Sequence, residues 1–343
     1  MLRNISPFFI VAFFGFFCSS CSVNTIQGKT SELQKKSYTQ QEETLKSCIE
    51  PLSKHPFLLI GHQAGDSTHY LKNLKKLKKK TSVQTPIQLM DHAFGPLGLN
   101  GIEIDVQMFK DPQTSCGQKV YVAHDAFGRS NAKLCKQLEV HTLEKALKHF
   151  LEKDYHKSKK IYIELKTSWI TPFIQLKKLN EHEKALSQKT LEVVADVLAK
   201  HPKGKKAIEN KSISFASFSF RALELLAGKQ KGKAFQYYQI LSAESRNFRK
   251  KLIKSKWITG VWFDYGLNGI NQIQTKVSEE PVTTFVTNLN KARKKAGLSP
   301  FSFYLGLQYT KFSCYQKSLC KKKPRLNRVG GFIFHFEGRE LKQ

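Results

Sequence analysis

The sequence predicts an α/β protein with eight parallel strands closed into a barrel, the TIM-type (β/α)8 architecture. Short runs of apolar, β-branched and aromatic residues recur from residue 57 onward, and longer stretches with helical periodicity separate them. Eight such strand-to-helix steps are the number that closes a barrel. An open, doubly wound sheet would show the same alternation, but no Gly-x-Gly-x-x-Gly follows the first strand, which removes the commonest use of that fold.

The elements can be placed in order along the chain. Barrel strands are expected at 57–61, 101–107, 160–166, 212–217, 234–239, 260–265, 302–308 and 330–336, and an extra strand at 119–124 should form a hairpin with the second. Helices are expected at 141–153, which opens with Thr142 in a capping position, at 190–201, and at 220–228, which ends at a glycine.

The first residues have the pattern of an export signal. A short basic start precedes an apolar run at 7–17, which is too short to span a bilayer, and small residues follow it. Cys-Ser-Ser-Cys-Ser at 18–22 resembles a bacterial lipobox, in which the cysteine after the cut is acylated. Cys21 fits this role better than Cys18, because Phe17 is a poor residue to precede a cut. The alternative is an ordinary signal peptide with two incidental cysteines.

Three segments follow from this pattern: a signal peptide at 1–21, a polar tether at 22–50 that is short of aromatic residues, and a barrel domain at 51–343. We therefore expect an exported lipoprotein, anchored to the membrane through Cys21 and facing the periplasm or the cell surface.

The charge balance predicts attraction to anionic surfaces. Lys and Arg number 57 against 27 Asp and Glu, a formal net charge of +30. No zinc-finger, RNP or helix-turn-helix pattern is present, so an anionic membrane surface is expected as a partner and nucleic acid is not. A lysine coat that is merely solvated explains the excess equally well. The basic stretch at 71–80 is either a solvated helix or a lip that meets anionic lipid beside the site.

Five further cysteines become candidates for disulfides if the chain is exported. Cys116 and Cys135 flank the predicted hairpin strand, and Cys314 and Cys320 bracket a short loop, so each pair could form locally. Cys48 would be left over. None of these spacings suits a structural zinc site.

Acidic, histidine and lysine residues gather on successive predicted strands. The side chains of residues two apart on a strand project from the same face. Glu103 and Asp105 should therefore point together into the barrel, and so should Glu164 and Lys166. Three carboxylates in an apolar lumen would repel one another unless a cation joined them, and oxygen ligands suit Mg²⁺ or Ca²⁺. The residues concerned are His62, Glu103, Asp105, His124, Glu164 and Lys166.

Six segments follow one another along the chain, and four of them carry these residues: Ile60–Gly65, Gly101–Gln107, Val122–Asp125, Thr142–Leu147, Ile163–Lys166 and Ser217-Phe218. Together they resemble the His-Arg-Gly, Gly-x-Glu-x-Asp-Val, Val-x-His-Asp, Thr-Leu-x-Glu, Glu-x-Lys and Ser-Phe segments of the glycerophosphodiester phosphodiesterase family, within the PLC-like phosphodiesterase barrels. The resemblance runs from about residue 58 to residue 225, and beyond it only the strand rhythm matches.

The resemblance implies a role for each residue. His62 and His124 would be the acid–base pair, and Lys166 would contact the substrate phosphate. Glu103, Asp105 and Glu164 would hold one divalent cation, Mg²⁺ or Ca²⁺. The implied reaction is hydrolysis of a glycerophosphodiester or a related phosphodiester derived from phospholipid.

Two departures from the family pattern widen the choice of function. Gln63 stands where the family has a phosphate-binding arginine, and Val83-Gln84-Thr85 replaces its Glu-Asn-Thr. Two alternatives therefore stay open: a phospholipase C- or D-like activity on intact lipid headgroups, and a catalytically silent barrel that binds anionic polymers.

Overall fold

The computed structural model describes residues 58–62, 85–124, 127–167, 178–241, 249–263, 279–307 and 331–335. The predicted signal peptide, the tether, Cys21, Gln63, the basic stretch at 71–80 and the pair Cys314 and Cys320 lie outside the described residues.

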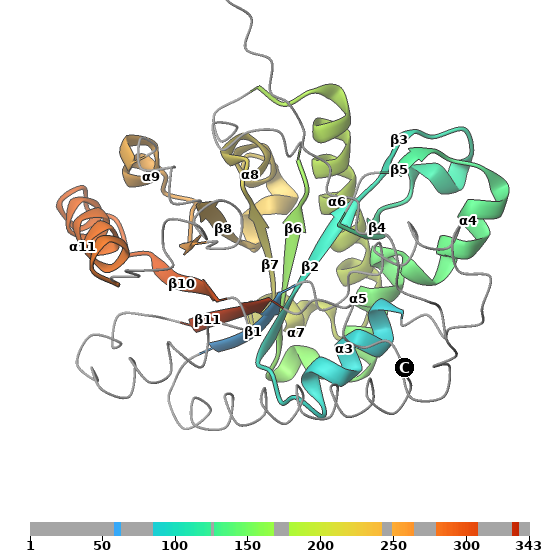
Figure 1. Cartoon of the computed structure of the whole chain (residues 1–343), viewed down its shortest axis with the longest axis horizontal. Coiled ribbons are helices and arrows are strands. Elements are labelled where there is room, and N and C mark those ends of the chain that lie inside the picture. The colour runs from blue at the N-terminus through green and yellow to red at the C-terminus, as the bar shows by residue number, and fades with distance from the viewer. Residues whose placement is uncertain are drawn as a thin grey trace, which may run out of the picture.

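The main sheet is a closed barrel of eight parallel strands (Figure 1). Neighbouring strands pair in chain order, and β1 closes the ring because it pairs with both β2 and β11. The predicted barrel fold is therefore confirmed. The strands are β1 (Leu58–His62), β2 (Gly101–Gln107), β6 (Lys160–Leu165), β7 (Ile213–Ser217), β8 (Gln236–Leu241), β9 (Gly260–Phe263), β10 (Ser302–Leu307) and β11 (Gly331–His335).

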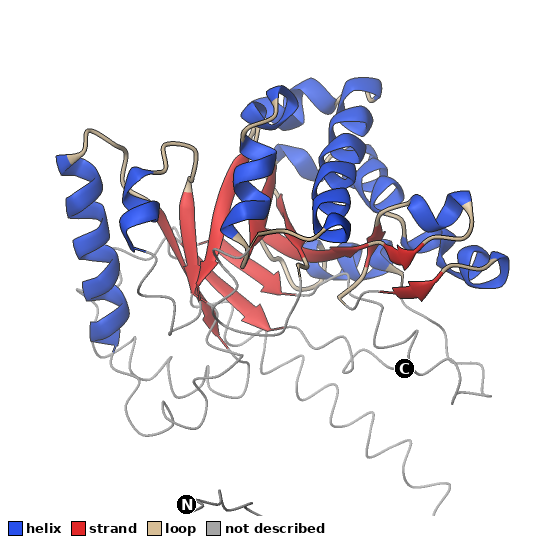
Figure 2. Ribbon diagram, turned by 90° about the horizontal axis from the view of Figure 1, so that it is seen from above, coloured by secondary structure: helices blue, strands red, loops and turns tan. Residues whose placement is uncertain are grey.

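The described helices cover much of the outside of this sheet, as Figure 2 shows. Thr142 caps the amino end of α5, where its hydroxyl accepts from Lys145 N, and Gly228 ends α8, as expected. The main helices are α3 (Pro86–Phe94), α5 (Leu143–Glu152), α6 (Glu181–Lys200), α7 (Gly204–Glu209), α8 (Phe220–Ala227), α9 (Arg249–Lys254) and α11 (Glu279–Lys295).

Helix α6 begins nine residues before the start expected from its apolar spacing. Asn180 and Glu183 form a capping box, in which each side chain accepts a hydrogen bond from the other residue's backbone N–H. This local signal sets the start of the helix, although the first two turns are rich in charge.

Two apolar clusters hold the barrel together. The larger lies between the outer face of the sheet and the helices, and the smaller fills the lumen. In the lumen the rings of Tyr162, Tyr238 and Tyr304 lie 5.3–6.0 Å apart, packed with Ile60 and other residues. Gly260 makes room for this packing, because a Cβ there would lie 2.8 Å from the Tyr238 ring. The lumen is therefore a filled core rather than a channel.

A small lobe leaves the barrel at the carboxyl end of β2. It contains β3 (Phe109–Asp111), β4 (Tyr121–Val122), β5 (Phe127–Arg129) and α4 (Ala132–Leu138). β4 runs antiparallel to β2, which confirms the predicted hairpin, while β3 and β5 form a separate two-stranded sheet.

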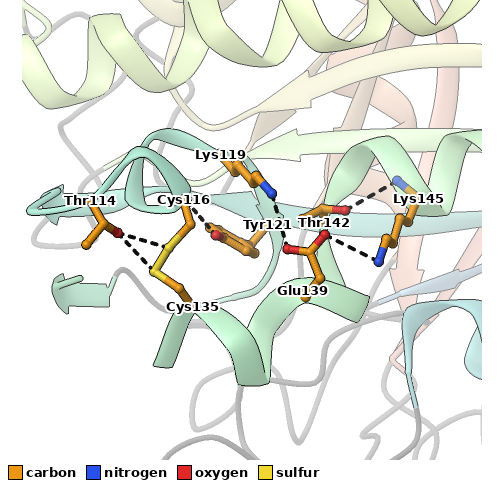
Figure 3. A network of polar contacts seen from close by, with 8 residues as sticks. All are labelled: Thr114, Cys116, Lys119, Tyr121, Cys135, Glu139, Thr142 and Lys145. Atoms are coloured by element: carbon orange, nitrogen blue, oxygen red, sulfur yellow. Dashed lines mark hydrogen bonds and ion pairs between the residues drawn. A yellow bond between two sulfur atoms is a disulfide. The ribbon is translucent and has the colours of Figure 1, made fainter. Parts of the chain in front are cut away.

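A disulfide between Cys116 and Cys135 closes the lobe, with the Cα atoms 5.8 Å apart (Figure 3). Thr114 Oγ1 contacts both sulfur atoms, and the Tyr121 hydroxyl donates to the Cys116 carbonyl. Nearby, Glu139 pairs with Lys119 at 3.1 Å and Lys145 at 3.4 Å. The pairing expected from the sequence is thus confirmed, and it ties α4 to the segment that precedes β4.

Replacing Cys135 with serine is expected to lower the free energy of unfolding by about 3 kcal/mol, because the bridge closes a loop of roughly 20 residues in the unfolded chain. Chemical denaturation under oxidising conditions measures the loss. Cys48→Ser is the control, since the sequence leaves Cys48 without a nearby partner. Equal stability of both variants would contradict a bridge in solution.

Candidate metal centre and active site

Three carboxylates from two neighbouring strands converge inside the barrel. Glu103 and Asp105 lie two apart on β2, and Glu164 lies on β6, where it pairs in register with Asp105. One oxygen atom from each lies within 4.8 Å of the others, and each side chain is at most 1% exposed. The predicted convergence is confirmed. The group is therefore buried inside the barrel.

Lys166 reaches into this acidic triad, defined as Glu103, Asp105 and Glu164. It follows β6 directly, and Lys166 Nζ lies 2.7 Å from Glu164 Oε1 and 3.2 Å from Asp105 Oδ1. The lysine side chain is only 5% exposed. One ammonium thus faces three carboxylates, so the site keeps an excess of negative charge when all four groups are ionised.

The electrostatics follow from burial and from this charge excess. Burial, reinforced by Asp105 and Glu164, raises the pKa of Glu103 well above its ordinary value. Burial also raises the pKa of Glu164 to about 7, against the opposing effect of Lys166. For Lys166, burial lowers the pKa, but Asp105, Glu164 and Glu103 outweigh it and the net direction is upward. Lys166 therefore stays charged, while Glu103 and Glu164 tend to retain protons.

The raised pKa values predict how stability depends on pH. A carboxyl whose folded pKa lies above its unfolded value binds more protons when folded, so its contribution favours folding at low pH. For Glu164 this contribution is lost as the pH rises from about 4.5 to about 7. We expect the metal-free protein to lose about 1.4 kcal/mol per pH unit per such group across this window. Denaturation at stepped pH measures it, and Glu164→Gln should flatten the slope.

The donor set fits a hard divalent cation. Carboxylate oxygens are the ligands that Mg²⁺ and Ca²⁺ take, at about 2.0–2.6 Å, so that donors on opposite sides of an ion lie about 4–5 Å apart. The oxygen atoms of the triad lie within 4.8 Å of one another, which does not exceed this span. A cation would also relieve the repulsion that raises the pKa of Glu103. It would have to compete with the Lys166 ammonium for Asp105 and Glu164.

The two predicted catalytic histidines are placed only in part. His62 ends β1, one residue beyond the pairing of Gly61 with Ile102, so its backbone lies level with Glu103. The His62 side chain is outside the described atoms. His124 follows β4 and is partly buried, and its carbonyl accepts from Gln107 Nε2 at 3.4 Å. Their proposed roles stay predictions.

Gln107 is a positioning residue that was not singled out from the sequence. It is buried, and its amide donates to the carbonyl of Lys166 at 3.1 Å as well as to that of His124. One side chain thus links β2 with the backbone of two predicted site residues. The sequence pointed to this position, because Gln107 shares a strand face with Glu103 and Asp105.

A further histidine, His335, ends β11 and lies in register with His62. Among the helices that the structure describes, none has the length and apolar character to cross a bilayer.

Comparison with known proteins finds distant structural similarity. No protein-family model and no curated protein matches the sequence. A crystal structure from Silicibacter pomeroyi DSS-3, described as a candidate glycerophosphoryl diester phosphodiesterase, is similar at 11% identity with a TM-score of 0.41, covering 83% of this chain and 91% of that chain. Endo-glycoceramidase II from Rhodococcus sp. is similar at 10% identity with a TM-score of 0.33, covering 81% and 73%. In sum, the chain is an α/β barrel with a buried acidic group that could hold a metal ion.

Proposed function

We propose that the protein is a metal-dependent phosphodiesterase that hydrolyses a glycerophosphodiester or a related phosphodiester derived from phospholipid. The observation that carries the proposal is the acidic triad, which brings three buried carboxylates from β2 and β6 within 4.8 Å of one another. Proteins rarely bury three carboxylates together unless a cation neutralises part of their charge. The order of the sequence motifs supports phosphodiester chemistry in particular.

In this mechanism Glu103, Asp105 and Glu164 would hold the cation, which supplies charge stabilisation to a phosphoryl oxygen when bound. Lys166 brings a permanent positive charge to the same point and neutralises part of the phosphate charge. One imidazole of the pair His62 and His124 accepts the proton of the attacking hydroxyl. The other donates a proton to the leaving alkoxide, because an unprotonated alkoxide is a strong base and a poor leaving group.

The histidine pair gives the direct test of this chemistry. Changing either His62 or His124 to alanine should lower turnover by roughly 10² to 10⁴, the usual contribution of a positioned proton-transfer group. Substrate binding should change little, because Lys166 and the cation hold the phosphate. Turnover should follow a bell-shaped pH profile in the parent protein and lose one limb in each variant. His201→Ala, at the end of α6, is the matched control. Full activity in His124→Ala would reject the pair.

One observation favours a second function. The Lys166 ammonium already bridges Asp105 and Glu164, so it could serve as the internal cation of a barrel that binds anionic polymers without catalysis. Assays with a series of substrates distinguish these functions. Turnover of glycerophosphocholine supports the proposal, and turnover only of intact bilayers supports a phospholipase-like activity. No turnover of any diester would leave the binding barrel.

A further inference from the structure

We infer that the amino-terminal face of the barrel docks onto an anionic phospholipid bilayer. The described α-to-β connections of this face are 95–100, 153–159, 201–212, 228–235, 255–259 and 296–301. The four that contain lysine, 153–159, 201–212, 228–235 and 255–259, are called here the basic face. In a parallel barrel all such connections meet at the end where the strands begin. Figure 1 shows α7, which lies in the connection at 201–212, at the end of the barrel away from the lobe.

Two adjacent connections carry the densest charge. In the one that enters β7, Lys205, Lys206 and Lys211 are exposed. In the connection that enters β8, Lys229, Lys231 and Lys233 are exposed as well. Because β7 and β8 pair directly, these two sets of lysines lie at neighbouring points of one face.

Part of this charge stays unpaired among the residues that the structure describes. Ion pairs do form between Lys203 and Asp154 at 2.8 Å, Lys206 and Glu209 at 3.3 Å, and Lys231 and Asp196 at 3.4 Å. Lys205, Lys229 and Lys233 make no ion pair with any residue that the structure describes. A cluster of uncompensated lysines costs electrostatic repulsion, which an anionic partner would relieve.

The helix dipole explains why some lysines lie at this end of the barrel, but it does not explain the lysines of the connections. Cations in the last turn of a helix interact favourably with its dipole, which accounts for Lys200 on α6, Lys254 on α9 and Lys295 on α11. Lys205 lies near the amino end of α7, where a cation is unfavourable, and Lys211 has a positive φ of 51° outside any helix. The connections are therefore basic beyond what capping requires.

The composition of the face and the path of the chain favour a bilayer as the partner. The four connections contain lysine and no arginine, whereas nucleic-acid sites favour arginine with exposed aromatic rings. β1 runs parallel to its neighbours, so Leu58 enters the barrel at this same end. The 57 residues before it include the predicted acylation site, Cys21. A lipid anchor and the basic face would thus act on the same membrane.

Docking through the basic face narrows the class of substrates that the site can meet. This conclusion rests on the proposed function. The acidic triad lies along β2 and at the carboxyl end of β6, and Lys166 lies beyond that end. Docking through the amino-terminal face holds this end of the barrel away from the bilayer. The site then meets soluble, deacylated diesters rather than lipids that are still embedded in the membrane.

A charge-matched pair of variants tests the docking. The chain is expressed from Ser22, which keeps every described residue and removes the apolar leader and any acyl group. Co-sedimentation is measured with vesicles of phosphatidylcholine alone and of phosphatidylcholine with phosphatidylglycerol. The test variant is K205Q/K229Q/K233Q. The control variant, K110Q/K133Q/K136Q, removes three exposed lysines from the lobe at the other end of the barrel.

We expect the test variant to bind anionic vesicles roughly 10- to 100-fold more weakly than the parent, from the attraction of each lysine to an anionic surface. The control should change less than threefold, and no chain should bind pure phosphatidylcholine. Equal losses in the two variants would overturn the inference. So would a parent chain that binds DNA or heparin but not anionic vesicles. Binding does not depend on turnover, so an inactive enzyme would leave the docking result intact.

Discussion

Replacing Lys166 with methionine is expected to destabilise the metal-free protein by about 3–5 kcal/mol, because it removes the ammonium from a buried group of three carboxylates. The loss should be largest above pH 7 and should shrink at lower pH, where Glu164 and Glu103 take up protons. Equilibrium denaturation in the presence of a chelator measures it.

The matched control is Lys160→Met at the other end of β6. Lys160 is partly buried and pairs with no carboxylate among the described residues, and burial together with Lys211 lowers its pKa. This change should cost little stability. Adding Ca²⁺ or Mg²⁺ should stabilise Lys166→Met more than the parent, since the ion no longer competes with the ammonium. If Lys166→Met unfolds like the parent and ignores divalent ions, the triad is not a charge-compensated cation site.

The second large effect is expected for Asp105→Asn, which should lower turnover by at least about 10³-fold while the barrel stays folded. Asp105 lies in register with Glu164, and its carboxylate pairs with Lys166, so it is central to the triad. Loss of one charged ligand weakens the cation site and the charge stabilisation that it supplies. Removing one of three like charges should leave the metal-free stability unchanged or higher.

Asp111→Asn is the control for this change. Asp111 ends β3 in the lobe, is 58% exposed and pairs with Arg129 at 2.9 Å. It should keep full turnover and nearly full stability, as surface pairs contribute at most about 1 kcal/mol. Isothermal titration with Ca²⁺ and Mg²⁺ on both variants separates loss of metal binding from loss of catalysis. An Asp105→Asn protein that retains turnover would exclude the proposed ligand role.

The barrel strands and the shared face of Glu103 and Asp105 were predictable because both depend on local periodicity. Alternation placed Glu103 and Asp105 on one face of β2, and each barrel strand was found to within a few residues. The contact of Lys166 with Asp105 was not predictable in the same way. Like the approach of Glu164 to Asp105, it depends on the register between β2 and β6, which the periodicity within each strand does not determine.

Arg293 shows a further limit of sequence reasoning. Its sequence context suggests one more solvated cation, yet the residue is only 2% exposed, and its guanidinium donates to the carbonyls of Leu252, Ser255 and Ser299. It also lies 3.8 Å from the centre of the Phe301 ring. These contacts join α9 to α11 and depend on tertiary packing, so charge patterning alone does not reveal them.

The central claim is that the triad supports metal-dependent hydrolysis of a phosphodiester. The most direct measurement is release of choline from glycerophosphocholine by the purified protein, first after chelation and then with Mg²⁺ or Ca²⁺ restored. The account predicts turnover with the ion, none after chelation, and none in Asp105→Asn under either condition. Turnover that survives chelation, or no turnover of this or any other diester with either ion, would contradict it.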